Sequence, residues 1–213
     1  SRRVFTQRIY LSQLDKKIRP LVKSAGGVLG ELASQIADID CVRLWHEEAL
    51  IKPPISNQLL FHYDGPAWSF QNDKTLTAWI ALDNISYDNG CMWILPGSHK
   101  IVLNNQKNKR KDPDFSQMNM NSVIEAIPEL KKIKPVPIPV KKGSIEFHSA
   151  YLVHGGGPNL THKPRKAFTF AMYPDGSTFN GNPNILTHKQ LKKLKIGDLL
   201  NDDKQNPILF SKL

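Results

Sequence analysis

Four residues in this chain have the types and spacing to bind a metal ion and a carboxylate: His62, Asp64, His154 and Arg165. His62 and Asp64 are separated by one residue, so both side chains leave the same face if this segment is a strand. His154, far along the chain, can complete a set of two histidines and one carboxylate, which holds one face of a non-haem iron and leaves other coordination positions open. The spacing therefore predicts an iron site with His62, Asp64 and His154 as ligands.

Arg165 adds a second chemical function to this set. It follows His154 at a distance that fits the next strand, and a guanidinium group binds carboxylates through two parallel hydrogen bonds. A metal with open positions beside an anchored acid is typical of an Fe(II)/2-oxoglutarate oxygenase. We therefore predict that Fe(II), 2-oxoglutarate and O2 act together, with the carboxylate of 2-oxoglutarate on Arg165.

Two other histidines compete with His154 for the third ligand position. His99 falls in a turn after a strand-like run, where exposure is expected, whereas His148 can share a strand face with His154. We favour His154 because Gly155–Gly157 lets the backbone approach a ligand closely and because Arg165 follows on the returning strand. The other histidines are interpreted as surface or packing residues: His46, His162 and His188.

The segments that position these residues change character along the chain. Residues 11–40 carry apolar residues at helical spacing; Pro20 is expected to break or kink a first helix, and a second helix is expected over 28–37, after Gly26 and Gly27. From residue 42 the pattern becomes short apolar or alternating runs between turn residues, which favours a sandwich or barrel of roughly eight strands. The predicted strands are 41–44, 59–63, 75–82, 91–95, 138–140, 144–147, 151–154 and 167–172.

One of these runs, Thr75–Leu82, alternates regularly, so Thr77 and Trp79 share a face. If that face lines the pocket, Trp79 forms a flat wall and Thr77 places a hydroxyl near the metal.

Two further segments lie outside the strands. Residues 103–137 are polar with one short helical candidate over 122–132 and are expected to form a lid-like insert, and residues 187–200 are expected to form an amphipathic helix.

Length and composition fit one domain, 1–213, without a membrane span, because the chain has no apolar run long enough to cross a bilayer. Two cysteines, Cys41 and Cys91, give no disulfide framework and fit a reducing compartment.

The net charge of +10 favours an anionic substrate, although much of it lies in basic runs interpreted as solvated surface. No nucleic-acid recognition motif accompanies the charge.

The last three residues, Ser211-Lys212-Leu213, match the signal that the peroxisomal import receptor reads at a C-terminus. If Leu213 is the natural end of the protein, we predict a peroxisomal location; otherwise we predict a cytoplasmic one.

Several segments together resemble the phytanoyl-CoA dioxygenase family of Fe(II)/2-oxoglutarate oxygenases, in the family's order over roughly residues 42–173. They are Lys52-Pro53-Pro54, His62-Tyr63-Asp64, Thr77–Asp83, Asn89–His99, Gly143-Ser144, Phe147-His148, His154–Asn159 and Arg165. The resemblance implies a mainly β fold, a double-stranded β-helix (jelly roll, cupin-like) with flanking α-helices, whose core covers about 42–173.

The resemblance also implies roles for individual residues. His62, Asp64 and His154 would bind iron, Arg165 would pair with the distal carboxylate of 2-oxoglutarate, and Trp79 would lie beside that cosubstrate. Gly156 occupies the place where relatives often have a serine that supports Arg165, so Thr77 or a water is expected to substitute. Ascorbate is expected to stimulate the enzyme.

The predicted activity is hydroxylation of an unactivated C–H bond of a small molecule, with α-hydroxylation of a branched acyl-CoA such as phytanoyl-CoA as one form of it. The alternatives are the same chemistry on a small acid or natural product, a non-catalytic jelly-roll binding protein, and a zinc hydrolase. A zinc hydrolase has no use for Arg165 and Trp79.

Overall fold

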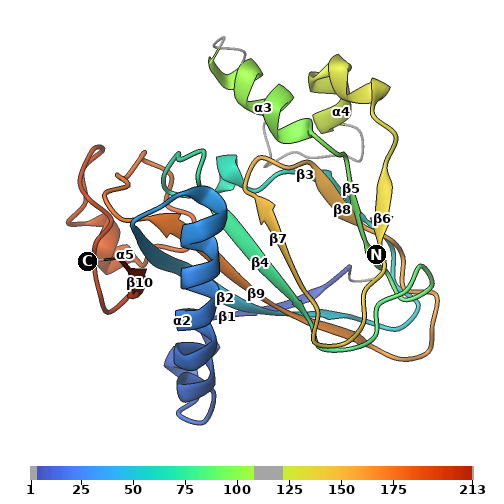
Figure 1. Cartoon of the computed structure of the whole chain (residues 1–213), viewed down its shortest axis with the longest axis horizontal. Coiled ribbons are helices and arrows are strands. Elements are labelled where there is room, and N and C mark those ends of the chain that lie inside the picture. The colour runs from blue at the N-terminus through green and yellow to red at the C-terminus, as the bar shows by residue number, and fades with distance from the viewer. Residues whose placement is uncertain (1–3, 108–121, 213) are drawn as a thin grey trace.

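Two antiparallel sheets dominate the computed structural model, which describes residues 4–107 and 122–212 (Figure 1). Among these residues, the six-stranded sheet has the order β1-β2-β9-β4-β7, with β10 also paired to β2, and the four-stranded sheet has the order β3-β8-β5-β6. The first sheet consists of β1 (Thr6–Ile9), β2 (Cys41–Lys52), β4 (Leu76–Ala81), β7 (Ile145–Ser149), β9 (Arg165–Pro174) and β10 (Ile208–Ser211). The second consists of β3 (Leu59–His62), β5 (Met92–Ile94), β6 (Val136–Ile138) and β8 (His154–Gly156).

The long strands β2 and β9 form the centre of the larger sheet, paired from Val42 opposite Pro174 to Lys52 opposite Arg165. The sequence predicted only the first part of β2, because the polar residues His46, Glu47 and Glu48 interrupt its apolar pattern. The structure shows that the strand continues through them and that His46 and Glu48 line an internal cavity. A strand that lines a polar cavity lacks the clean alternation of a strand that faces only a core.

The N-terminal helices are α1 (Leu11–Leu14) and α2 (Ile18–Ala37), and α2 runs alongside the larger sheet (Figure 1). The predicted break at Gly26 and Gly27 was wrong, because α2 is continuous through both. Pro20 lies in its first turn, where the missing N–H would have no helical acceptor. A β-carbon at Gly26 would lie 2.9 Å from Leu209, so this glycine lets β10 pack closely against the helix.

The insert predicted over 103–137 begins within α3 (Ser98–Lys107) and includes α4 (Ser122–Ala126) and the short 3-10 helix η3 (Pro128–Lys132); its central part lies outside the described residues. The helical candidate over 122–132 is thus split in two. The split falls just before Pro128, which disfavours helical backbone at the preceding residue. Val102, Val123 and Leu130 are all buried in the main core, so the two described ends of the insert are firmly packed.

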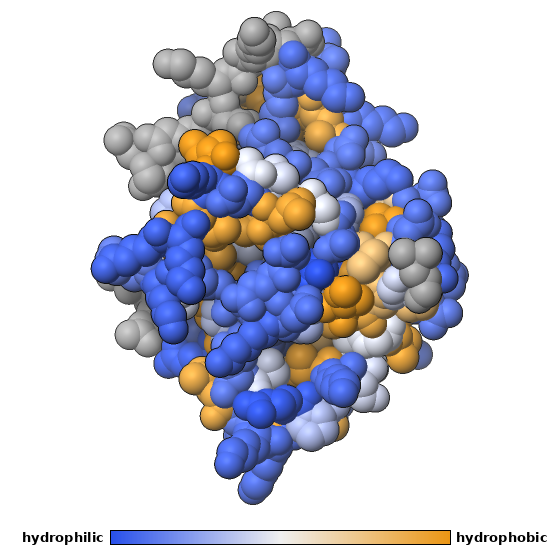
Figure 2. Space-filling view, turned by 90° about the vertical axis from the view of Figure 1, so that its left-hand side faces the viewer, coloured by the Kyte–Doolittle hydropathy of each residue, from blue (hydrophilic) through white to orange (hydrophobic). Residues whose placement is uncertain are grey.

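The predicted helix over 187–200 was wrong, because only α5 (His188–Leu191) is helical. Thr187 caps it in a reciprocal capping box with Gln190. After Leu191 the chain forms turns at residues 192–193 and 196–197, and Gly197 adopts the left-handed conformation. The face that carries this segment is mostly hydrophilic, with small separate apolar groups (Figure 2). The lysines from Lys189 to Lys195 are exposed there, which agrees with solvated surface.

Two residues of the predicted import signal belong to the larger sheet or its border. Ser211 pairs with Cys41, and Lys212 donates its backbone N–H to Asp40 and forms an ion pair with the same residue at 3.0 Å. Leu213 lies outside the described residues. Among the described residues, no helix has the length and apolarity needed to span a membrane.

Candidate metal centre

Strand pairing brings the first two candidate ligands together. His62 ends β3 and His154 begins β8, and the two lie opposite each other in the ladder with ring centroids 4.4 Å apart. Asp64 follows at the start of the 3-10 helix η1 (Gly65–Ala67). Tyr63, between the ligands, is buried in the core, as expected for alternate residues of an extended chain.

The backbone fixes the orientation of both imidazole rings. Nδ1 of His62 lies 2.7 Å from the carbonyl oxygen of Leu60, and Nδ1 of His154 lies 3.0 Å from that of Leu152. Because a carbonyl only accepts, each Nδ1 must carry the proton and donate it, which leaves each Nε2 with a free lone pair. This is the tautomer that a metal ligand needs.

The free ring nitrogens and the Asp64 carboxylate converge on one point. Nε2 of His62 and of His154 lie 3.7 Å and 4.0 Å from Oδ1 of Asp64, too far for hydrogen bonds. One ligand atom from each residue lies within 4.8 Å of the other two. Three donors that face each other without bonding to each other fit around a single divalent ion, and two histidines with one carboxylate are the set that holds non-haem iron.

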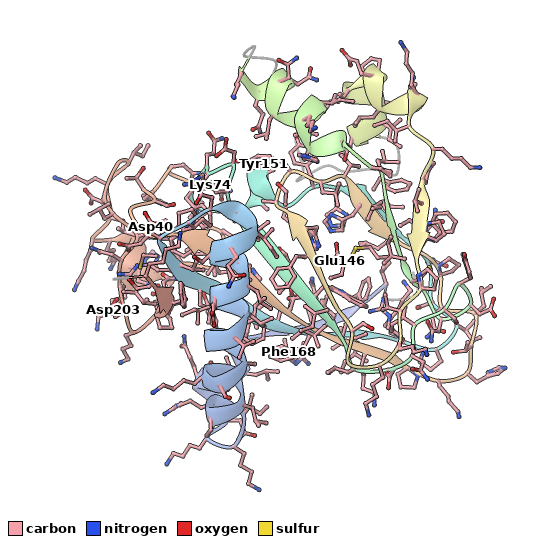
Figure 3. All side chains as sticks on the ribbon, viewed as in Figure 1. Asp40, Lys74, Glu146, Tyr151, Phe168 and Asp203 are labelled. Atoms are coloured by element: carbon pink, nitrogen blue, oxygen red, sulfur yellow. The ribbon has the colours of Figure 1, made fainter. Side chains whose placement is uncertain are left out.

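His148 extends this cluster, although the sequence only ranked it as a rival ligand. It lies on β7, with Nδ1 2.8 Å from Oε2 of Glu146 and Nε2 3.8 Å from Oδ2 of Asp64. Figure 3 shows Glu146 directed from β7 toward the space between the sheets. Burial opposes charge on His148, but Glu146 and Asp64 raise its pKa to about 10. Burial likewise opposes ionisation of Asp64, but His154, His148 and His62 lower the pKa of that carboxyl.

We expect His148 to orient Asp64 rather than to bind the metal. Its Nε2 is buried without a hydrogen-bond partner and faces the second carboxylate oxygen. Replacing His148 by alanine should therefore weaken Mn(II) binding about tenfold, since side chains that orient a metal ligand typically contribute at least that much to metal affinity. Calorimetric titration of the metal-free protein measures this effect, with the exposed His162→Ala as control. Unchanged affinity in His148→Ala would leave only a packing role.

Arg165 lies at the other end of the cavity, at the first residue of β9. One terminal nitrogen donates to the Gly90 carbonyl at 2.9 Å, while Nε and the second terminal nitrogen are buried without partners. The guanidinium carbon lies 5.4 Å from the centre of the Trp79 ring and 5.2 Å from that of Phe5. Burial lowers the pKa of Arg165 to about 10. Unpaired donors on a buried cation are costly, so they indicate an anionic ligand.

The metal cluster and Arg165 line the same cavity, whose volume is about 660 Å³. Thr77, Trp79 and Gly156 line it as well, and the hydroxyl of Thr77 is buried without a partner. Thr77 pairs in the sheet with His148, and Trp79 with Glu146, so the face predicted from alternation is the one that faces the cavity. Of the other histidines, His99 lies in the first turn of α3, outside the cavity lining.

Gly155 is required for the two sheet strands that carry the histidines to meet. A β-carbon there would lie 2.8 Å from the carbonyl oxygen of Leu59, whereas at Gly156 the nearest atom would be 3.5 Å away. We therefore expect Gly155→Ala to lower the free energy of unfolding by about 1–3 kcal/mol and to weaken metal binding by separating His62 from His154. Gly156→Ala is the matched control. Denaturant unfolding and Mn(II) titration compare the two, and equal behaviour would contradict this view of Gly155.

Sequence reasoning missed three residues near the site: His46, Glu48 and Glu146. His46 was interpreted as a surface or packing residue, but it lines the cavity, and burial lowers its pKa to about 4. Glu146 and Glu48 were not considered. The spacing of Glu146 and His148 at alternate positions of one strand is the signal that could have placed Glu146 beside the cluster.

Comparison with known proteins gives this arrangement a context. The family model of phytanoyl-CoA dioxygenase (PhyH) matches residues 5–167. The chain belongs to this family. The family member described here is 32% identical over 130 residues to human peroxisomal phytanoyl-CoA dioxygenase, an alignment that covers 58% of this chain and 37% of the relative. It is 29% identical over 161 residues to a probable alpha-ketoglutarate-dependent hypophosphite dioxygenase of Stutzerimonas stutzeri, covering 74% of this chain and 52% of the relative.

The family member thus spans about half or less of the length of these relatives. Among solved structures it resembles the epimerase SnoN, crystallised with Fe3+, alpha ketoglutarate and nogalamycin RO, with a TM-score of 0.79 and 24% identity over 97% of this chain and 79% of the other. The carbocyclase SnoK gives a TM-score of 0.77 at 23% identity, covering 97% of this chain and 76% of the other. This likeness confirms the predicted mainly β, cupin-like fold with flanking helices.

Proposed function

We propose that this protein is an Fe(II)/2-oxoglutarate-dependent dioxygenase that hydroxylates an unactivated C–H bond of a small molecule. The observation that supports it best is that one cavity contains both the His62, Asp64 and His154 cluster and the unpaired donors of Arg165. A cluster of this kind alone would also suit a zinc hydrolase. A buried arginine with free donors in the same cavity adds a place for the second carboxylate of a dicarboxylic acid.

The residues of the candidate metal centre have separate tasks in this proposal. His62, Asp64 and His154 hold the ferrous ion from one side, and His148 holds Asp64 in place. Arg165 binds the far carboxylate of 2-oxoglutarate through the donors that are free in the structure. Trp79 supports the guanidinium with its ring face, and Thr77 directs its hydroxyl into the cavity beside His148. With ferrous ion and 2-oxoglutarate bound, the site consumes O2, releases succinate and carbon dioxide, and adds a hydroxyl group to the substrate.

Anaerobic titration tests the proposal without knowledge of the substrate. Fe(II) followed by 2-oxoglutarate should produce a weak visible charge-transfer band, which neither a zinc hydrolase nor a non-catalytic binding protein would give. The same addition to Arg165→Ala should give no band at an equal 2-oxoglutarate concentration. A wild-type protein that binds Fe(II) but shows no spectral change with 2-oxoglutarate would refute the assignment.

Two substrate classes follow from the sequence: a branched acyl-CoA such as phytanoyl-CoA, and a small acid or natural product. The human relative is named for phytanoyl-CoA and peroxisomes, and the bacterial relative for hypophosphite. Substrate-stimulated succinate release, measured with phytanoyl-CoA and with free acids and amino acids, separates the classes. Ascorbate is expected to raise the rate. Import into peroxisomes remains a prediction from Ser211-Lys212-Leu213.

A further inference from the structure

One wall of the cavity is formed by β2, and it carries a carboxylate that the proposed chemistry does not use. His46, Glu48 and Leu50 occupy alternate positions of this strand and all line the cavity. In the sheet, Glu48 pairs with Ile9 of β1 and with Thr169 of β9. Arg165 pairs with Lys52, so along β2 Glu48 lies between the arginine end of the cavity and His46. The carboxylate therefore faces space beside the metal cluster.

Glu48 has no hydrogen bond or ion pair with any of the residues that the structure describes. None of its neighbours in the sheet is cationic, since they are Ile9 and Thr169, and the same strand face offers only His46 and Leu50. Burial, and to a smaller extent repulsion from Asp64, raises the pKa of Glu48 to about 7. His46 cannot compensate the charge, because burial lowers the pKa of its imidazole to about 4.

The cationic side chains that the described residues place near the cavity have other partners. The ammonium group of Lys52 donates to the Asn57 carbonyl at 2.7 Å and lies 4.6 Å from the Phe5 ring. His148 is bonded to Glu146, and Arg165 is bonded to Gly90 and has the cosubstrate carboxylate as its proposed partner. A partly buried carboxylate without a counter-charge is unfavourable when ionised, and a cationic group on a ligand would supply the counter-charge that the described side chains do not provide.

We propose that Glu48 recognises the substrate, and that the substrate carries a cationic nitrogen which pairs with this carboxylate while a nearby carbon faces the metal cluster. The proposal rests on the proposed function, because it takes the rest of the cavity as the place of metal and 2-oxoglutarate. It makes a small ammonium or guanidinium compound a better occupant than an apolar branched acyl chain, which would bury Glu48 without a partner.

Paramagnetic relaxation of ligand protons by Mn(II) bound to this protein tests the proposal with simple probes. Hexylammonium, hexanol and hexanoate share one carbon chain and differ only in the head group. In the presence of saturating 2-oxoglutarate, the relaxation of probe protons by Mn(II) should give hexylammonium a dissociation constant about tenfold lower than those of hexanol and hexanoate. A preference of this size is typical of a close charge pair in a partly buried site. Glu48→Gln should remove the preference and Glu48→Asp should retain it. Glu31→Gln, which removes the same charge from the exposed face of α2, should behave like wild type.

The outcomes separate the two proposals. Relaxation of the 2-oxoglutarate protons by Mn(II) in the wild type reports on the proposed function alone, and its absence would refute that function whatever the probes do. If 2-oxoglutarate responds but hexanol or hexanoate binds as well as hexylammonium, the role of Glu48 is overturned. A preference for hexylammonium that persists in Glu48→Gln overturns it too. The wild-type order of the three probes decides the matter even if Glu48→Gln fails to fold.

Discussion

Succinate formation should fall at least about a hundredfold when Asp64 is replaced by alanine. The change removes the single carboxylate of the cluster and leaves two neutral imidazoles, so the ferrous ion loses one ligand and the only negative charge among the three. It also leaves the charged His148 without the carboxylate that faces it at 3.8 Å. The loss should therefore appear both in metal affinity and in the rate at saturating Fe(II), because the remaining ligands no longer fix the ion.

Coupled measurement of Mn(II) affinity and of 2-oxoglutarate turnover with saturating Fe(II) checks this expectation. Asp73→Ala is a suitable control, since Asp73 is an exposed carboxylate that does not line the cavity. Wild-type turnover in Asp64→Ala would show that the cluster is not the metal site.

Arg165→Ala should raise the Michaelis constant for 2-oxoglutarate about a hundredfold, equivalent to about 3 kcal/mol of binding free energy. The reason is that the cavity offers two unpaired donors on a rigid planar group, and the carboxylate they would bind has no other described cation free to take it. Arg165→Lys should recover only part of the loss, because an ammonium group is a single point of charge and cannot form the bidentate pair.

The two effects can be told apart by their kinetics. Arg165→Ala should leave Mn(II) affinity in the absence of 2-oxoglutarate close to that of wild type, whereas Asp64→Ala should not. Lys166→Ala removes the adjacent but exposed cation of β9 and serves as the control. An unchanged Michaelis constant in Arg165→Ala would mean that the cosubstrate carboxylate lies elsewhere.

Much of the candidate site could be predicted because its chemistry is local in sequence. The spacing of His62 and Asp64, the alternation around Thr77 and Trp79, and the glycines after His154 each reflect the two-residue period of a strand. The structure brings these segments into one cavity. What brings them together, the register of His62 opposite His154, is a long-range pairing that no local pattern specifies.

The errors have equally physical causes. The helix α2 continues through Gly26 and Gly27 although glycine has a low helix propensity. At Gly26 the helix packs closely against Leu209, a contact that joins distant parts of the chain. The tail over 187–200 has the apolar spacing of a helix, but α5 ends at Leu191 and the turn at Gly197 follows. Glu48 and His46 were missed because polar residues on a cavity wall obscure the pattern of the strand that carries them.

The backbone carbonyls of Leu60 and Leu152 already hold both imidazole rings in the tautomer that accepts a metal. Because the ligands are already oriented, an incoming metal ion does not have to reorganise them. The same preorganisation gives the site little selectivity against other divalent ions. Nitrogen and oxygen donors of this type generally bind Cu2+ and Zn2+ more tightly than Fe2+. Protein isolated in the presence of zinc should therefore be inert until it is stripped with a chelator and reloaded, and in the cell the supply of metals, more than the protein, would decide which ion is installed.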